Sequence, residues 1–208
     1  MKKSGPGRPE DPSKRREILN AGRALMFEFG PSAVTMEAVA RNAGVAKPTL
    51  YRRFPSRDAL VAEIAGNVAE SMAAHFRIIP GSADDLRQAL IKFGSRFSTF
   101  LSGHEHKRYI HALGAAGRIA QSTREAIYRS GPLSARDQLA AWFAQLDQRN
   151  LLNCRNAEYS ADQFLGMLMG MDLIRTLYHV AHSRDAKANA RRVNLVVDDF
   201  LALHRVND

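Results

Sequence analysis

Basic, hydroxyl and small side chains are concentrated in residues 47–57 of this 208-residue chain. Lys47 and Arg52 carry charges that suit a phosphate or the edge of a guanine base. Thr49 and Tyr51 carry hydroxyl groups that can donate hydrogen bonds to phosphate oxygens. These residue types predict the binding of a polyanion. They do not predict catalysis, since they do not combine a nucleophile with a general base.

The net charge is concentrated in the same part of the chain. Thirty Lys and Arg against 21 Asp and Glu give a formal charge of +9 and a pI near 10.1. Residues 1–58 hold twelve of the basic and six of the acidic residues, so this quarter of the chain carries +6. A basic face is often only solvated, but this concentration indicates a surface that meets nucleic acid.

Composition excludes several protein classes. A hydrophobic content of 45% excludes a disordered chain, and the single cysteine, Cys154, excludes an internal disulfide and favours a reducing compartment. The basic start of the chain has no apolar stretch after it, so it is not a secretory signal. The longest apolar run, residues 164–171, is shorter than the roughly 20 residues of a membrane helix. We expect a soluble, cytoplasmic protein with no membrane partner.

Enzymatic and metal sites find little support in the residue spacing. His104 and His106 fall on different faces of a helix, whereas His179 and His182 could share a metal but have no Cys or carboxylate cluster beside them. Cys154 lies outside any nucleophile motif, and no phosphate-binding glycine loop is present. We therefore expect no catalytic residue, no metal site and no cofactor.

Two short predicted helices position the basic cluster. Thr35 stands as N-cap before an apolar-periodic segment that ends at Gly44, and a second helix follows over residues 47–54, with Pro48 tolerated in its first turn. A helix from about residue 12 to Gly30 precedes them. Two short helices joined by a tight turn, the second basic at its start, predict a helix-turn-helix that binds DNA.

The remaining segments also have helical periodicity, and no run alternates as a strand would. A long helix is predicted from Ser56 to Pro80, and two helices, 158–182 and 186–205, close the chain. The expected fold is all-α. It has a flexible basic arm (1–11), a three-helix DNA-binding domain (12–58) and a helical effector-binding and dimerisation domain (59–208).

Residues 43–60, AGVAKPTLYRRFPSRDAL, resemble the DNA-binding domain of the TetR family of bacterial transcription regulators. The resemblance extends back through residues 35–40 and 18–22. One departure is that Pro31 follows Gly30 where the family usually has an aromatic residue, and we expect Phe29 to fill that space. The resemblance implies a repressor that binds a palindromic operator as a homodimer and is released by a small-molecule effector.

The predicted DNA contacts divide into two groups. Three side chains are candidates for reading base edges: Lys47, Pro48 and Arg52. Five are expected to meet phosphates: Thr35, Thr49, Tyr51, Arg53 and Arg57. For all of these except Thr35, the resemblance implies the contact. An alternative for Tyr51 is a core residue that braces the turn.

The N-terminal arm offers a further contact. Gly7-Arg8-Pro9 resembles the short core of minor-groove binding tails, so Arg8 either enters a narrow A·T-rich groove or is simply solvated. Lys14, Arg15 and Arg16 add unspecific attraction to phosphates.

The resemblance implies an effector pocket among the middle helices. Its candidate lining is apolar and suits a hydrophobic or aromatic molecule: Met72, Phe76, Phe97, Leu101, Tyr109, Leu113, Trp142, Phe143, Met167 and Met171. The alternative, residue by residue, is that these side chains are ordinary core, because apolar stripes usually are.

The resemblance also implies that the last two helices form a dimer interface. The candidate residues are Phe164, Gly166, Gly170, Val193, Val197, Phe200 and Leu201. The alternative is that this apolar helix is buried inside one monomer. Three other functions stay open: a regulator that activates or needs no ligand, a nonspecific architectural DNA binder, and a helical carrier or enzyme. The basic N-terminal region argues against the last.

Overall fold

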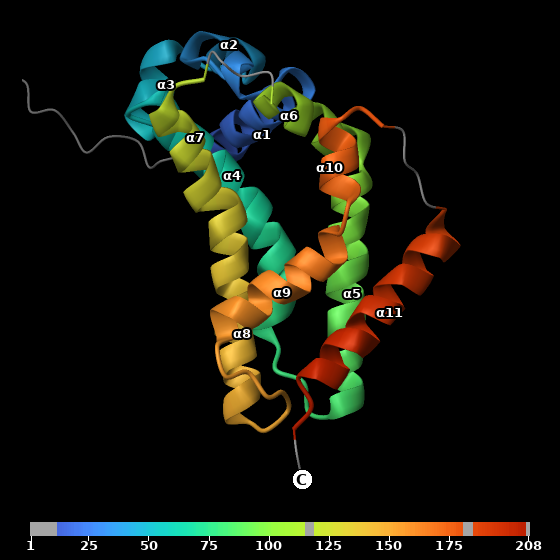
Figure 1. The fold of residues 1–208 in the computed structure, drawn as a ribbon. Coiled ribbons are helices and arrows are strands. Elements are labelled where there is room, and N and C mark those ends of the chain that lie inside the picture. Colours follow the sequence, from blue (N-terminus) through green and yellow to red (C-terminus); the bar gives the residue numbers. More distant parts are fainter. Residues whose placement is uncertain (1–11, 115–118, 181–184, 207–208) are drawn as a thin grey trace, which may run out of the picture.

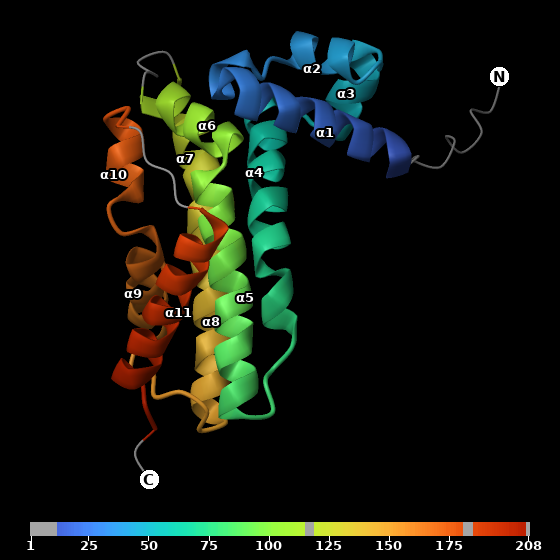
Figure 2. The ribbon, with the colours of Figure 1, turned by 90° about the vertical axis from the view of Figure 1, so that its right-hand side faces the viewer.

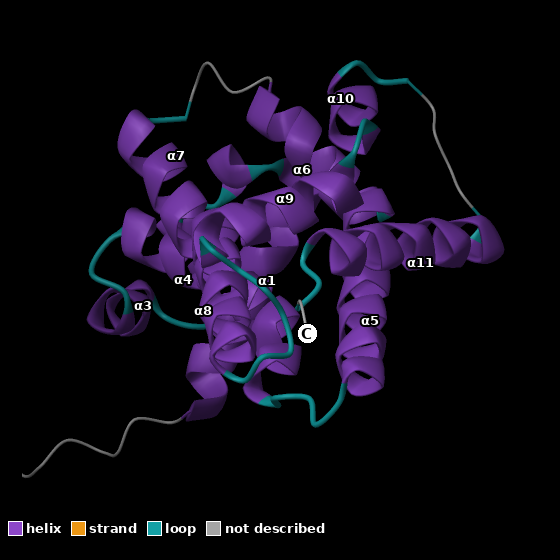
Figure 3. Cartoon of the chain, turned by 60° about the horizontal axis from the view of Figure 1, so that its bottom comes forward, coloured by secondary structure: helices purple, strands orange, loops and turns teal. Residues whose placement is uncertain are grey.

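The structure is a computed structural model that describes residues 12–114, 119–180 and 185–206. Within these ranges every regular element is helical, which confirms the all-α fold (Figures 1 and 3). The N-terminal elements are α1 (Pro12–Phe29), η1 (Pro31–Ala33), α2 (Met36–Asn42), α3 (Lys47–Arg53), α4 (Arg57–Ala73) and η2 (Ala74–Arg77). The others are α5 (Ala83–Ser102), α6 (His104–Gly114), α7 (Gln121–Tyr128), η3 (Arg129–Leu133), α8 (Ser134–Gln148), α9 (Ala157–Met169), α10 (Asp172–Leu177) and α11 (Ala186–Leu203).

Side-chain caps define where several helices begin. Thr35, Ser56, Ser82, Asn156 and Asp185 each accept a hydrogen bond from a backbone N–H three residues later. Each cap satisfies one of the donors that the first helical turn leaves unpaired, which contributes about 1 kcal/mol. Each of the helices α2, α4, α5, α9 and α11 therefore begins directly after a residue whose side chain can cap it.

Helices α1 to α3 form a head at one end of the molecule, and α4 runs from this head along the body (Figure 2). The head core includes Ile18, Val39, Leu50 and Phe54, all buried. Tyr109 of α6 belongs to the same cluster, and α6 packs against α1. The head is therefore attached to the body through a shared apolar core and not through a linker.

An aromatic cluster fills the body. Its ring centroids lie about 5 to 6 Å apart along a chain of contacts that joins η2, α5, α8, α9 and α11. The members are Phe76, Phe93, Trp142, Phe143, Phe164 and Phe200. Large rings pack at this spacing with favourable edge and offset geometry, so the interior of the body is occupied by its own side chains.

Two of the predicted long helices are interrupted. The helix predicted to run to Pro80 ends at Ala73 and tightens into η2. The helix predicted over 158–182 breaks at Gly170, whose φ of 48° ends α9 before α10 begins. Arg192 of α11 donates hydrogen bonds to the carbonyls of Met167 (2.9 Å) and Leu168 (2.6 Å). These bonds satisfy carbonyls in the last turn of α9, which have no partner within the helix.

The prediction that Phe29 fills the space beside Gly30 is wrong. The Phe29 side chain is 61% exposed, whereas Pro31 is itself buried. Gly30 adopts a φ of 86°, and a Cβ there would lie 2.4 Å from the Cβ of Ala112. The head therefore closes on α6 through a glycine and a proline in place of an aromatic ring. Among the described residues, no helix has the length and apolar character to cross a membrane.

Candidate nucleic-acid interface

A tight turn joins α2 and α3. Gly44 has a φ of 62°, a conformation that favours glycine, and the Val45 N–H donates to the Ala40 carbonyl at 3.0 Å. Thr35 is exposed at the start of α2, and its Oγ1 accepts from the Ala38 N–H at 3.1 Å. The hydroxyl that was predicted to meet a phosphate is thus held by its own helix, next to the unpaired N–H groups of that helix end.

Helix α3 has a buried face and an open face. Leu50, and Phe54 directly after the helix, are buried in the head core. Four residues of the helix are exposed: Lys47, Pro48, Tyr51 and Arg52. Tyr51 and Arg52 each follow Lys47 or Pro48 by three to five positions, so the four lie on one side of the helix, which we call the recognition face. All three candidates for base reading lie on this face.

Tyr51 lies on the recognition face and does not brace the core. Its side chain is 48% exposed, so the phenol is available to a ligand. Thr49 and Arg53 lie at the edge of the face and are half-buried. The buried Nε of Arg53 has no hydrogen-bond partner among the described residues.

Lys47 is paired in the absence of DNA. Its Nζ lies 3.0 Å from Oε1 of Glu37 on α2, and this hydrogen bond lowers the pKa of the Glu37 carboxyl. Both side chains are more than half exposed, so the pair contributes little stability. A phosphate or base edge can compete for Lys47 at small cost.

Arg57 does not lie where the sequence predicted. Its guanidinium group turns inward, and it donates to the carbonyls of Pro31 (2.6 Å) and Val34 (2.7 Å) and to Oγ1 of Thr123 on α7 (3.0 Å). Asp58 in turn accepts from Thr123 at 2.6 Å. These bonds place the guanidinium group between η1, the residue that follows it and α7, which packs against α4. We call this set of bonds the Arg57 link.

Arg15 is also engaged within the protein. Its Nε donates to Oε1 of Glu63 on α4 at 2.9 Å, and its guanidinium carbon lies 4.7 Å from the centroid of the Phe54 ring. This pairing joins α1 to α4 and reduces the availability of Arg15 for phosphates. Arg8 falls outside the described residues.

The Arg57 link is a feature that sequence reasoning missed. Thr123 is 66 residues from Arg57, and a single threonine at the start of a predicted helix has no local pattern that points to such a partner. Only the packing of α7 against α4 brings the two residues together.

Most of the residues predicted to line an effector pocket pack in one of the two apolar cores. Phe76, Phe97, Trp142, Phe143 and Met167 belong to the body core or pack against it. Tyr109 and Leu113 lie with the head core instead, Met72 and Leu101 are half-buried, and Met171 is exposed. Two cavities, at residues 74–92 and 83–206, include none of these side chains. Half of the predicted pocket residues therefore contribute to the core of the body.

Most of the residues predicted for the dimer interface are buried within the monomer. Phe164, Val193, Val197 and Phe200 have no exposed surface, because α9 and α11 turn these side chains towards α5 and α8. Leu201 is half-buried, whereas Gly166 and Gly170 are exposed. Exposed large apolar side chains occur on α9, α10 and α11 and on the two residues that flank α10: Tyr159, Met171, Ile174, Leu177, Tyr178, Leu195 and Leu203. We call this set the outer face.

The head and its recognition face define a helix-turn-helix DNA-binding protein, and comparison with known proteins specifies the family. Residues 18–64 match the model described as bacterial regulatory proteins, tetR family, and residues 88–206 match the AefR-like transcriptional repressor C-terminal domain. Because the second match alone covers more than half of the chain, the protein belongs to the TetR family of transcriptional regulators. The family and its relatives are transcriptional regulators and not enzymes.

Individual relatives are similar over parts of the chain. An HTH-type transcriptional regulator of Mycobacterium bovis is 37% identical over 75 residues, 36% of this chain and 38% of the relative. The HTH-type transcriptional repressor KstR2 of Mycobacterium tuberculosis is 27% identical over 113 residues, 54% of this chain and 56% of KstR2. The chain thus spans less than two thirds of these curated relatives. The solved structure of the flavonoid-responsive regulator FrrA superposes with a TM-score of 0.70 at 23% identity, over 95% of this chain and all of FrrA, which shows a common fold.

Proposed function

We propose that this TetR-family regulator represses transcription by binding a palindromic operator as a homodimer, and that a small effector with an apolar or aromatic body releases it. The observation that carries the proposal is the recognition face, on which Lys47, Pro48, Tyr51 and Arg52 are exposed while Leu50 anchors the helix in the head core. A helix of this kind fits the major groove of DNA. The regulator would act in the cytoplasm, where it meets chromosomal DNA.

The proposed contacts follow the exposure of each side chain. Lys47, Pro48 and Arg52 read base edges, and Tyr51 with Thr49 holds the flanking phosphates. Arg53 and the N–H groups beside Thr35 add further phosphate contacts, and Arg8 would reach the minor groove. Arg57 is left out of this set, because its donors are used by the Arg57 link.

The outer face supports the proposed homodimer. A single recognition helix covers only a few base pairs, so helix-turn-helix proteins pair their readers about 34 Å apart. Tyr159 of α9 and Leu195 and Leu203 of α11 have exposed side chains, as does Tyr178 directly after α10. Helices α9 and α11 lie side by side (Figure 2). Large exposed apolar side chains on neighbouring helices are typical of association surfaces. A second copy of the chain would cover them.

The organisation of the chain follows from this proposal. Residues 12–58 would bind DNA, after the basic arm 1–11, and residues 59–208 would bind the effector and the second copy. Repression is supported by the match of residues 88–206 to a repressor domain and by the similarity to the repressor KstR2.

The test is selection of binding sites from random duplex DNA followed by gel-shift assays. We expect an inverted repeat whose half-sites lie about one helical turn apart, bound by two chains. Binding should weaken steeply with salt, because phosphate contacts release counterions. Selected sequences that share no inverted repeat would contradict the proposal.

A further inference from the structure

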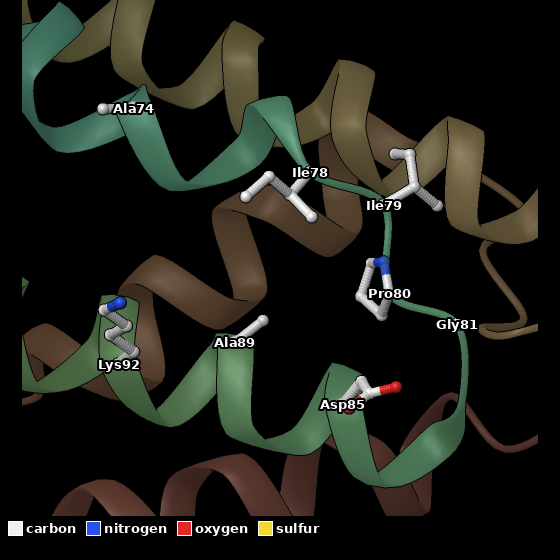
Figure 4. Close-up of a pocket in the computed structure, with 8 residues that line it drawn as sticks. All are labelled: Ala74, Ile78, Ile79, Pro80, Gly81, Asp85, Ala89 and Lys92. Carbon is white, nitrogen blue, oxygen red and sulfur yellow. The ribbon is translucent and has the colours of Figure 1, made fainter.

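A groove lies between the end of α4 and the first half of α5, at the end of the body far from the head. One wall is η2 and the segment that follows it (Figure 4). The other wall is one face of α5 with Asp85, Ala89 and Lys92, which are spaced four and then three residues apart. The cavity volume is about 530 Å³, within the usual range of small-molecule sites, about 300 to 1,000 Å³. We call it the α4–α5 groove.

The lining of the groove is mainly apolar and partly exposed. Ile78 is 75% exposed, which is unusual for a side chain of its size, and Ala74, Ile79, Pro80 and Ala89 continue the apolar surface on both walls. Covering this surface removes apolar area from water, which is favourable by about 25 cal/mol per Å². The groove is therefore suited to the apolar body of a small molecule.

The two charged residues of the groove differ in their availability. Asp85 accepts a hydrogen bond from Ser82 Oγ at 2.8 Å while its own N–H donates to that oxygen, so its carboxylate belongs to the cap of α5. Lys92 is exposed, and none of the ion pairs among the described residues includes it. The groove thus offers one cation at one end and a negative charge at the other.

We propose that the α4–α5 groove is the effector site, and that its ligand is an amphipathic monoanion: an apolar body with a single carboxylate or phosphate that pairs with Lys92. Lys92 lies seven positions after Asp85, a distance of about 10 Å along the helix, which sets the length of the apolar body. Asp85 disfavours a second anionic group at the far end, so a dianion of the same length binds less well. This inference rests on the proposed effector response and names its ligand class and site.

The groove is connected to both the core and the head. The indole N–H of Trp142 donates to the Ile78 carbonyl at 3.1 Å, and Trp142 stacks on Phe76 of η2 with centroids 5.3 Å apart. The segment that forms the wall continues directly from α4, whose first residue, Arg57, holds the head. A ligand that prefers one position of this wall therefore has a direct route to the position of the head.

Decanoate is a suitable probe, and Trp142 is a suitable reporter because it is the only tryptophan of the chain. We expect a saturable change in Trp142 fluorescence when decanoate is added to the full-length protein. Decanol lacks the charge and decanedioate carries a second one, so both should bind about three- to fivefold more weakly, the range of an exposed ion pair.

Two variants locate the site. Lys92→Gln should weaken decanoate about three- to fivefold and leave decanol unchanged, whereas Ala89→Phe should block both probes by filling the groove. The matched control is Lys187→Gln, an exposed lysine on α11, which should bind decanoate as the parent does. Melting temperatures without ligand verify that the variants fold.

Operator binding, followed by fluorescence anisotropy, separates this inference from the proposed function. Release of the operator by decanoate in the parent and not in Ala89→Phe supports both. Saturable decanoate binding that is the same in the parent, Lys92→Gln and Ala89→Phe overturns the groove, as does the absence of any saturable signal. If another compound releases the operator equally from the parent and Ala89→Phe, the regulator responds to an effector but the groove is not its site.

Discussion

Arg52 and Arg57 are five residues apart, yet their guanidinium groups have different surroundings. Arg52 is exposed on the recognition face, whereas Arg57 is held by two backbone carbonyls and Thr123. An exposed arginine is free to pair with a guanine edge, and one whose donors are satisfied inside the protein is not. Substitution of each residue should therefore affect different properties.

Arg52→Ala should relax operator preference with little effect on folding. Loss of one bidentate base contact costs about 1 to 3 kcal/mol of discrimination at the position it reads, and exposed substitutions change the stability by about 0.5 kcal/mol or less. The measurement is the affinity for a selected operator and for single-base variants, with urea unfolding as the control. Unchanged discrimination at every base position would show that Arg52 does not read the sequence.

Arg57→Ala should mainly destabilise the protein. It removes two hydrogen bonds from a charged donor, to the Pro31 and Val34 carbonyls, and each contributes about 1.5 kcal/mol at a partly exposed side chain, so we expect a loss of about 3 kcal/mol in the free energy of unfolding. Operator preference should stay as in the parent once the folded fraction is accounted for. An unfolding midpoint equal to that of the parent, with a lower slope of affinity against salt, would instead make Arg57 a phosphate contact.

At the scale of elements, the contact between α1 and α6 attaches the head to the body. His106 of α6 lies there against Phe100 and near Tyr109, with ring centroids 4.5 and 6.2 Å away, and its buried Nδ1 has no partner among the described residues. Burial lowers the pKa of His106 to about 4 and raises that of Tyr109. Both groups are therefore neutral when the head is docked at neutral pH.

Stability should consequently fall with acidification, and His106 accounts for a defined share. The pKa of His106 is lower in the folded state than its unfolded value near 6.5. The neutral imidazole therefore contributes fully to the free energy of unfolding above pH 6.5, and this contribution is lost as the pH falls towards 4. Between pH 7.5 and 5 the loss is about 2 kcal/mol. Urea unfolding of the parent and His106→Phe at both values measures it, since other groups titrate alike in the two proteins. An equal fall in both proteins would show that His106 does not contribute.

At the scale of the whole molecule, we expect the outer face to hold two chains together, so that their two recognition helices can bind one operator. Leu195→Glu places a charge in the middle of α11, where the leucine is 65% exposed in one chain and would be covered in a dimer. We expect monomers in sedimentation measurements and weaker operator binding, because burial of an unpaired carboxylate is unfavourable. Phe29→Glu, at another exposed apolar residue, is the matched control and should remain dimeric. A dimeric Leu195→Glu would place the interface elsewhere.

Local sequence signals predicted the head well. The N-caps, the turn glycine and the alternation of Leu50 and Phe54 with basic residues act over a few residues, so α2, the turn and α3 followed from the sequence. The same reasoning placed Phe29 inward, which is wrong, and it did not anticipate the bond of Arg57 to Thr123, because both depend on α6 or α7, which are distant in sequence. A periodic pattern specifies that a helix has an apolar side but not which neighbour covers it.

The sequence by itself determined that this protein is all-helical, that its excess positive charge lies in a helix-turn-helix, and that the residues of that motif resemble a family of transcription regulators. The tertiary structure alone decided which arginines remain available, since the packing of distant helices determines which guanidinium groups have acceptors inside the protein. It also decided that Phe164, Val197 and Phe200 form core while Leu195 and Tyr159 face outward, and that Ile78 lines a groove. The reason is that packing is settled by all helices together: the rings fill the interior first, and only the surface left over is available to a second copy or to a ligand.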